Sequence, residues 1–192
     1  MEQIKFIGQD IINSEIKNVE AIGYYDYFEI KNSTIISSDF SKSNLQGVDI
    51  DNSKIQLCNF SNVSLSGHSY QKVFFENCTL VGVDFTDSFL EEVLFENCNL
   101  NYSNFSGCHL KKVKFIECKL DDASFSNLKW DKLEFDKCSM KSVEFFHTKL
   151  KNIDFSSCDI KDLKVLLDSL KGAIVSYDQA LGLALLLGIK IK

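Results

Sequence analysis

A period of five residues runs through most of the chain and limits the folds that it can adopt. From Ile30 to Val165, nearly every residue whose number is divisible by five is large and apolar. A second apolar or small residue stands two positions earlier, and the remaining positions are mostly Asp, Asn, Ser, Lys or Glu. This period matches neither an α-helix, at about 3.6, nor a strand, at about 2. The pattern indicates a chain that runs straight briefly and turns a corner every five residues.

A second period of twenty residues indicates that four such corners close one coil. Three sets of residues repeat at this interval: Cys58, Cys78, Cys98, Cys118, Cys138 and Cys158; Phe75, Phe95, Phe115, Phe135 and Phe155; and Phe85, Phe105, Phe125 and Phe145. Stacked coils would hydrogen-bond at the strand spacing of about 4.8 Å, and stacking buries what no single coil can bury. We therefore predict an all-β fold, a right-handed quadrilateral β-helix. The positions divisible by five and those two before them should face its core.

One corner of the predicted coil is rich in residues that tolerate a positive φ. The third set continues toward the N-terminus with Leu65 and Leu45 at the same interval. Two positions after the residues of this extended column stand Gly47, Gly67, Asp87, Gly107, Asn127 and His147. A type II turn needs a positive φ at its third residue. We therefore expect type II turns at this corner and less regular turns at the others.

The repeat resembles the pentapeptide-repeat family, whose consensus is A(D/N)Lxx. The stretches Val83-Asp-Phe-Thr-Asp87 and Ser103-Asn-Phe-Ser-Gly107 carry the resemblance most closely, and it extends over about residues 28–175. Membership of this family implies the solenoid fold. It does not imply one function, because a fold can serve many functions.

The C-terminal tail departs from the repeat. Ser176 and Gln179 form the sequence pattern of a capping box, and Gly188 suits the position after a helix. The residues between them are apolar on every side, so the helix needs cover from the coils and from a partner. We predict three regions: an N-terminal cap with an irregular first coil at 1–27, the β-helix at 28–175, and a capping and dimerisation helix with a short tail at 176–192.

This tail is similar to the C-terminus of the Qnr-like quinolone-resistance group, in which a comparable helix joins two monomers end to end. The resemblance implies a homodimer, and the apolar residues of the tail predict its interface: Leu183, Leu186, Leu187, Ile189 and Ile191. It also implies a partner, because Qnr-like proteins bind DNA gyrase or topoisomerase IV as rod-shaped mimics of duplex DNA.

Charge is unevenly distributed along the chain. Residues 1–110 carry 15 acids and 6 lysines, whereas residues 111–192 carry 12 acids and 15 lysines. A lysine-free stretch provides a candidate partner-binding surface, here called the acidic surface: Glu76, Asp84, Asp87, Glu91, Glu92 and Glu96. One wall of the later coils, the lysine wall, carries Lys111, Lys112, Lys129, Lys132, Lys149 and Lys151. An end-to-end dimer would place the basic half at its centre and the acidic surface toward its tips.

The chemically reactive residue types do not form a recognisable catalytic or metal-binding pattern. The laddered cysteines would have parallel side chains with Cβ atoms about 4.8 Å apart, beyond the usual disulfide range, so we interpret them as reduced core thiols. His109 and His147 fall on outward positions, whereas His68 takes an inward position that we interpret as a local distortion. No nucleophile and base pair, phosphate loop or zinc motif stands out. We predict no enzymatic activity, no cofactor and no metal.

Two functions follow from this sequence. In the first, the protein is a DNA mimic that binds gyrase or topoisomerase IV and modulates the enzyme or protects it from quinolones. In the alternative, it is a generic interaction or structural scaffold with no topoisomerase role. The formal charge of −6 argues against direct nucleic-acid binding. Neither a signal peptide nor a membrane span is recognisable, so we expect a cytoplasmic protein without membrane association.

Overall fold

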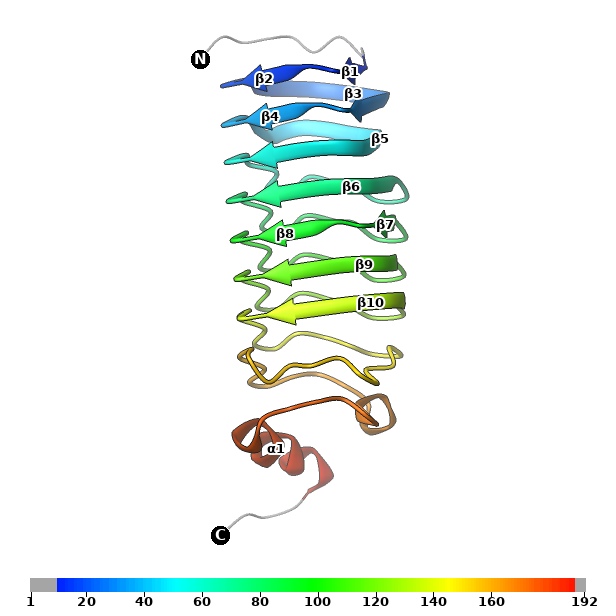
Figure 1. Ribbon diagram of the computed structural model, residues 1–192, viewed down its shortest axis with the longest axis vertical. Coiled ribbons are helices and arrows are strands. Elements are labelled where there is room, and N and C mark those ends of the chain that lie inside the picture. The colour runs from blue at the N-terminus through cyan, green and yellow to red at the C-terminus, as the bar shows by residue number, and fades with distance from the viewer. Residues whose placement is uncertain (1–9, 189–192) are drawn as a thin grey trace.

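The computed structural model describes residues 10–188, which form a rod of stacked four-sided coils (Figure 1). The strands are β1 (Ile11–Ile12), β2 (Glu15–Lys17), β3 (Glu20–Lys31), β4 (Thr34–Ile36), β5 (Asp39–Gln56), β6 (Ser69–Glu76), β7 (Phe89–Glu91), β8 (Leu94–Glu96), β9 (His109–Ile116) and β10 (Lys129–Asp136). All ten pair in parallel, and the main path runs β1-β3-β5-β6-β7-β9-β10. The predicted right-handed quadrilateral β-helix is therefore confirmed.

Successive coils stack with a constant offset of twenty residues over most of the rod. Phe75 pairs with Phe95, and Phe95 pairs with Phe115, so the predicted column of phenylalanines lies on one wall. The first coil differs, because Ile11 pairs with Ile30, an offset of nineteen, and the register shifts after Glu20. Parallel stacking thus begins N-terminal to residue 28, with a coil that is one residue shorter than the rest.

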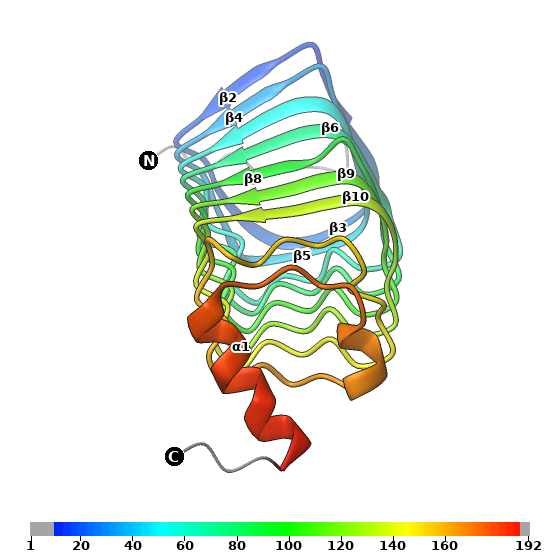
Figure 2. The same ribbon diagram turned by 60° about the horizontal axis from the view of Figure 1, so that its bottom comes forward.

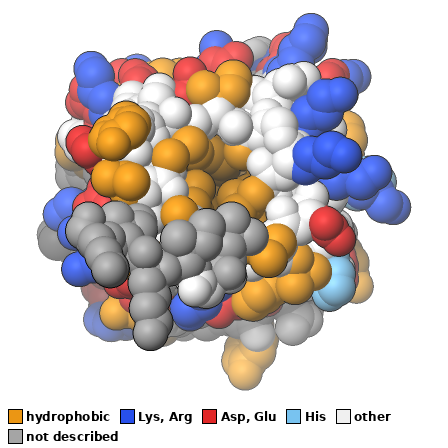
Figure 3. Space-filling view, turned by 90° about the horizontal axis from the view of Figure 1, so that it is seen from below, with side chains coloured by type: hydrophobic (Ala, Val, Ile, Leu, Met, Phe, Trp, Pro, Cys, Tyr) orange, Lys and Arg blue, Asp and Glu red, His pale blue; other side chains and the backbone are white. Residues whose placement is uncertain are grey.

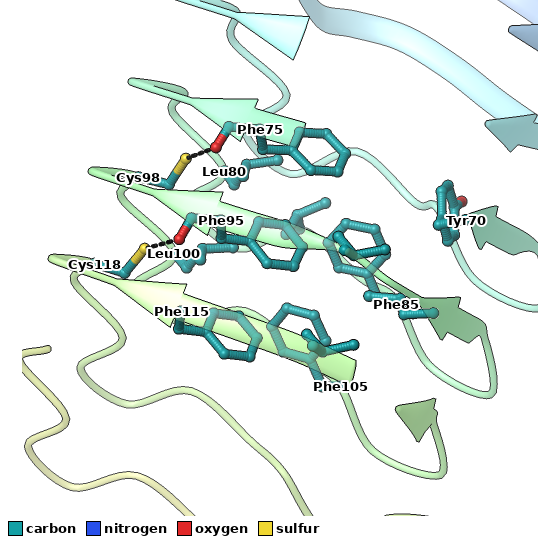
Figure 4. Close-up of a cluster of buried hydrophobic side chains, with 14 of the residues drawn as sticks. Tyr70, Phe75, Leu80, Phe85, Phe95, Cys98, Leu100, Phe105, Phe115 and Cys118 are labelled. Atoms are coloured by element: carbon teal, nitrogen blue, oxygen red, sulfur yellow. Dashed lines mark hydrogen bonds between the residues drawn. The ribbon is translucent and has the colours of Figure 1, made fainter. Parts of the chain in front are cut away.

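The core is a continuous column of side chains from the two inward positions of each repeat. Phe75, Phe95 and Phe115 stack with ring centroids 4.9 Å apart and nearly parallel planes (Figure 4). Phe85 and Phe105 form a second stack at 5.0 Å, and rings of the two stacks meet edge to face. Both arrangements are favourable for aromatic quadrupoles, so each ring is held by its own column and by the next.

The cysteines line the core as free thiols, and all seven are buried. Cys98 Sγ donates to the Phe75 carbonyl at 3.5 Å and Cys118 Sγ donates to the Phe95 carbonyl at 3.4 Å, each reaching the preceding coil (Figure 4). Cys108 stands on another wall, and burial raises the pKa of its thiol to about 12. The thiols therefore act as small core residues that also tie neighbouring coils together.

The corners are more uniform than the sequence predicts. The residues at the predicted type II corner do adopt positive φ, including Gly67 at 74° and Asp87 at 57°. However, equivalent residues at the other corners do so too, among them Leu57 at 54° and Tyr102 at 62°. The expectation of less regular turns elsewhere is wrong, because nearly every corner of the square coil is turned by a residue in the left-handed region.

The C-terminal end of the rod is helical. A short 3₁₀ helix, η1 (Leu167–Leu170), precedes α1 (Tyr177–Ala184), which continues into η2 (Leu185–Leu187). Gly188 follows with a φ of 71°, the left-handed conformation that ends the helix as predicted. Figure 2 shows α1 at the end of the rod, beyond the last coils.

Candidate interaction surfaces

A hollow lies between α1 and the last coil. Ser176 and Gln179 form the predicted capping box, in which each side chain bonds the backbone of the other residue, at 3.3 and 2.8 Å. The same Gln179 donates through Nε2 to the carbonyls of Phe155 (2.8 Å) and Cys158 (2.6 Å), which fixes α1 on the coil. The hollow beside it has a volume of about 500 Å³ and is lined mainly by apolar groups of Cys158, Ile160, Leu163, Leu183, Leu185 and Leu186.

The leucines expected at a dimer interface differ in exposure. Leu183 packs against the core and lines the hollow, whereas Leu186 lines it with 44% of its surface exposed. Leu181 and Leu185 are also exposed. Figure 3 shows hydrophobic side chains gathered on this end of the molecule. Of the other predicted interface residues, Leu187 belongs to η2 but its side chain is not described, and Ile189 and Ile191 lie outside the described residues.

The acidic surface is distributed over three walls of the rod. Glu76 and Glu96 are neighbours in adjoining coils of one wall. By the twenty-residue register, Asp84 and Asp87 flank Phe85 on a second wall, and Glu91 and Glu92 follow Leu90 on a third. The six carboxylates therefore do not form one patch.

Lysines from adjoining coils neutralise half of these carboxylates. Glu76 accepts from Lys54 at 3.0 Å, and that bond, with a second from Gln56, lowers the pKa of the Glu76 carboxyl. Glu91 and Glu92 pair with Lys111 and Lys112, each at 2.6 Å. The hydrogen bond from Lys112 lowers the pKa of Glu92. The sequence carries a signal for two of these pairs, since Lys111 and Lys112 follow Glu91 and Glu92 by twenty residues, which is one coil.

Asp84, Asp87 and Glu96 make no ion pair with a lysine of residues 10–188. Asp84 is engaged locally, where its Oδ1 accepts from the backbone N–H of Thr86 at 3.0 Å. The lysine wall is divided in the same way. Its first coil, Lys111 and Lys112, is paired, whereas the lysines of the following coils have no carboxylate partner among the described residues.

The histidines do not assemble a catalytic group in the described chain. His109 and His147 are exposed, as predicted. His68 is partly exposed, with Nδ1 3.6 Å from Asp49 Oδ1, so its ring points to the edge of the coil. Within residues 10–188, no cluster of three or more His, Cys, Asp and Glu side chains has a metal-binding arrangement. No helix in this range is long and apolar enough to cross a membrane.

Comparison with known proteins identifies the family. The profile of the pentapeptide repeat region matches residues 28–105, 56–125 and 105–174, which together span most of the sequence. The chain therefore belongs to the pentapeptide-repeat family. No curated protein matches the sequence.

Similar solved structures include two other pentapeptide-repeat rods. HetL, a protein involved in heterocyst differentiation regulation from the cyanobacterium Nostoc sp. strain PCC 7120, is 18% identical, with a TM-score of 0.50. The match covers 89% of this chain and 92% of HetL. QnrB1, a plasmid-mediated fluoroquinolone resistance protein, is 20% identical with a TM-score of 0.49, covering 100% of this chain and 95% of that one. At such identities the similarity concerns the fold alone.

Proposed function

We propose that the protein is a non-catalytic interaction scaffold that assembles as an end-to-end dimer through its C-terminal helix. The observation that carries this proposal is the apolar hollow beside α1, together with the exposed leucines that border it. Burying apolar surface gains roughly 25 cal/mol per Å². A second copy offers the same leucines, so a twofold pairing would fill both hollows with like surfaces.

Light scattering tests the dimer with a matched pair of variants. The wild-type protein should have twice the 21.8 kDa mass of one chain. Leu186→Asp should be monomeric, because pairing would bury an unpartnered charge. Leu57→Asp is the control, since Leu57 is also exposed but stands at a corner of the rod away from α1. A monomeric wild type, or a Leu186→Asp variant that remains dimeric, would contradict the proposal.

DNA gyrase or topoisomerase IV is the second candidate as a partner of this scaffold. The observation that favours it is that three outward carboxylates of this rod-shaped molecule make no ion pair with a described lysine: Asp84, Asp87 and Glu96. Duplex DNA presents about one negative charge per 1.7 Å, so a topoisomerase surface that binds DNA attracts carboxylates as well. The paired carboxylates Glu76, Glu91 and Glu92 should contribute little.

A supercoiling assay with purified gyrase, with and without a quinolone, distinguishes the two functions. If the unpaired carboxylates make the contact, the variant Asp84→Asn/Asp87→Asn/Glu96→Gln should lose its effect on gyrase. The variant Glu76→Gln/Glu91→Gln/Glu92→Gln removes as many charges and should retain it. Asn already occupies equivalent outward positions at Asn104 and Asn127, so the first variant should fold. If wild-type protein affects neither supercoiling nor quinolone action, the topoisomerase role is excluded and the scaffold stands.

A further inference from the structure

Charge pairing between adjoining coils is common on this surface. Nine ion pairs join residues of neighbouring coils: Lys31–Asp51, Lys42–Glu20, Lys54–Glu76, Lys111–Glu91, Lys112–Glu92, Lys114–Glu134, Lys137–Glu117, Lys141–Asp159 and Lys164–Glu144. These pairs occur on all four walls. A region in which several neighbouring lysines lack such partners is therefore a departure from the pattern of the rod.

One region of the rod departs from this pattern, and we call it the free lysine face. It comprises Lys129, Lys132, Lys149, Lys151 and Lys171, which belong to three consecutive coils of one wall and are all exposed. None of them has a carboxylate within ion-pair distance in residues 10–188. The preceding coil supplies none on this wall, because it carries Lys111 and Lys112 there, which already bind Glu91 and Glu92 one coil further away. Figure 3 shows lysine side chains gathered along one side of the molecule.

The stacked coils space these lysines regularly along one wall. Stacked coils place Lys129 and Lys149 about 4.8 Å apart along the rod, and alternate residues such as Lys149 and Lys151 lie about 6.6 Å apart across it. Trp130, between two of the columns, donates through Nε1 to the Lys149 carbonyl at 2.8 Å and so joins the two coils. An extended peptide repeats side chains on one face at the same spacing of about 6.6 Å. The array therefore matches acidic residues at alternate positions of such a peptide.

We propose that the free lysine face binds an extended acidic segment of a partner protein, which deepens the scaffold function proposed above by naming the class of partner. Asp131 lies within the face and has no ion-pair partner in the described chain. A continuous phosphate backbone would meet this carboxylate repulsively, whereas a peptide can place a neutral or basic residue opposite it. The chain also contains no arginine, the residue best suited to bidentate phosphate contacts, and its charge is −6. These features favour an acidic peptide over a nucleic acid.

Fluorescence anisotropy with a labelled peptide of alternating glutamate and serine tests the proposal, and the single tryptophan, Trp130, provides a second signal in the unlabelled protein. Lys129→Gln/Lys149→Gln/Lys151→Gln should weaken binding by about tenfold or more, since three exposed charge contacts are lost together. The control Lys114→Gln/Lys137→Gln/Lys141→Gln removes the same charge from paired lysines on other walls, and should bind like the wild type. Binding to the wild type should weaken with added salt.

Three results would overturn the proposal: no binding of the glutamate peptide, equal loss of affinity in both triple variants, or tighter binding of a single-stranded oligothymidylate than of the peptide. The Leu186→Asp variant separates this proposal from the dimer. The free lysine face lies within one chain, so a monomeric variant should bind the peptide as the wild type does. A wild-type protein that is monomeric but binds the peptide would reject the dimer alone, and a dimeric wild type that does not bind the peptide would reject the face alone.

Discussion

Some of the inward positions that lie two residues before a large core residue are occupied by serine. Whether such a serine stabilises the core depends on the hydrogen bonds that its hydroxyl makes. Ser88 Oγ donates to the Leu65 carbonyl at 3.0 Å and accepts from the backbone N–H of His68 at 3.3 Å. Ser103 occupies the same position of the repeat on another wall and is also buried, yet its Oγ has no hydrogen-bond partner among the described residues. A buried hydroxyl without a partner loses its bonds to water and gains none in return.

These two serines should therefore respond to alanine in opposite ways. Ser103→Ala should raise the free energy of unfolding by about 1 kcal/mol, because it removes an unsatisfied polar atom at little cost in volume. Ser88→Ala should lower it by about 1–2 kcal/mol, because the Leu65 carbonyl and the His68 N–H lose a partner. Urea denaturation of both variants measures the difference. Destabilisation of equal size in both would show that Ser103 is satisfied in solution.

At the scale of the element, Gln179 ends the stack by substituting for another coil. In the body of the rod, a carbonyl such as that of Cys138 accepts from the backbone N–H of Asp159 in the next coil, at 2.9 Å. Cys158 has no such coil after it, and its carbonyl accepts from Gln179 Nε2 instead. The side chain thus supplies a donor to a carbonyl at the open end of the sheet, while α1 packs over that end. Both features protect a sheet edge that could otherwise pair with another chain.

Replacing Gln179 with Glu separates these roles. Glutamate serves the capping box as well as glutamine does, but it cannot donate to the Phe155 and Cys158 carbonyls. We expect Gln179→Glu to lower the free energy of unfolding by about 2 kcal/mol, since the Cys158 carbonyl loses its donor, the Phe155 carbonyl keeps only the Cys158 N–H, and both face a carboxylate. Ser176→Ala, which removes the N-cap alone, should cost about 1 kcal/mol. Thermal and urea denaturation would contradict this account if Gln179→Glu were as stable as the wild type.

At this scale, the structure of the corners and of the first coil differs from what the sequence predicts. Glycine and asparagine identify positive φ at one corner, but Leu57, Glu92 and Tyr102 adopt it as well, which their residue types do not indicate. The geometry of closure overrides local preference there. An irregular first coil was expected within 1–27, but its nineteen-residue offset was not, because the apolar pattern before residue 28 is weak. The stacking of Phe95 on Phe115, by contrast, follows directly from the two periods.

At the scale of the whole molecule, each coil is stabilised by its two neighbours, so position along the rod should set the effect of a core substitution. Phe115 contacts two rings in its own column, Phe95 and Phe135, and two in the next, Phe105 and Phe125. Phe155 occupies the same column near the C-terminal end. It contacts one ring in each column, Phe135 and Phe145, at 5.9 and 5.8 Å.

Phe115→Ala should therefore destabilise the protein by about 4–5 kcal/mol and Phe155→Ala by about 3 kcal/mol, because the terminal ring leaves fewer contacts unfilled. Urea denaturation gives both values, and hydrogen exchange shows where the rod opens. For Phe155→Ala, exchange should increase first in the last coils and α1. An equal loss of stability from both substitutions would contradict a neighbour-by-neighbour account of stability.

The surface of the rod was predicted less completely than its core. The distribution of charges along the sequence predicts the acidic surface and the lysine wall. It does not predict which carboxylates and lysines form ion pairs. Glu91 and Lys111 are twenty residues apart, so the register brings them together, and their long side chains close the gap to 2.6 Å. The register predicts which columns meet, whereas the pairing depends on side-chain rotamers that a sequence does not specify. The free lysine face is defined by the absence of such pairs among the described residues, so the charge count alone does not predict it.

Because one coil takes twenty residues, the number of residues between two surface patches determines the angle between them about the rod axis. Each repeat of five residues turns the chain by one wall, so a deletion of one repeat would rotate everything after it by a quarter turn about the rod axis. A deletion of four repeats, such as residues 98–117, would shorten the rod by one coil and leave every column aligned, since Cys118 would follow in the place of Cys98. The angle between the free lysine face and the carboxylates nearer the N-terminus is therefore adjustable in steps of ninety degrees, independently of the distance between them. Insertions and deletions of whole repeats in such a protein therefore change the orientation of one binding surface relative to another, while the kind of core stays the same.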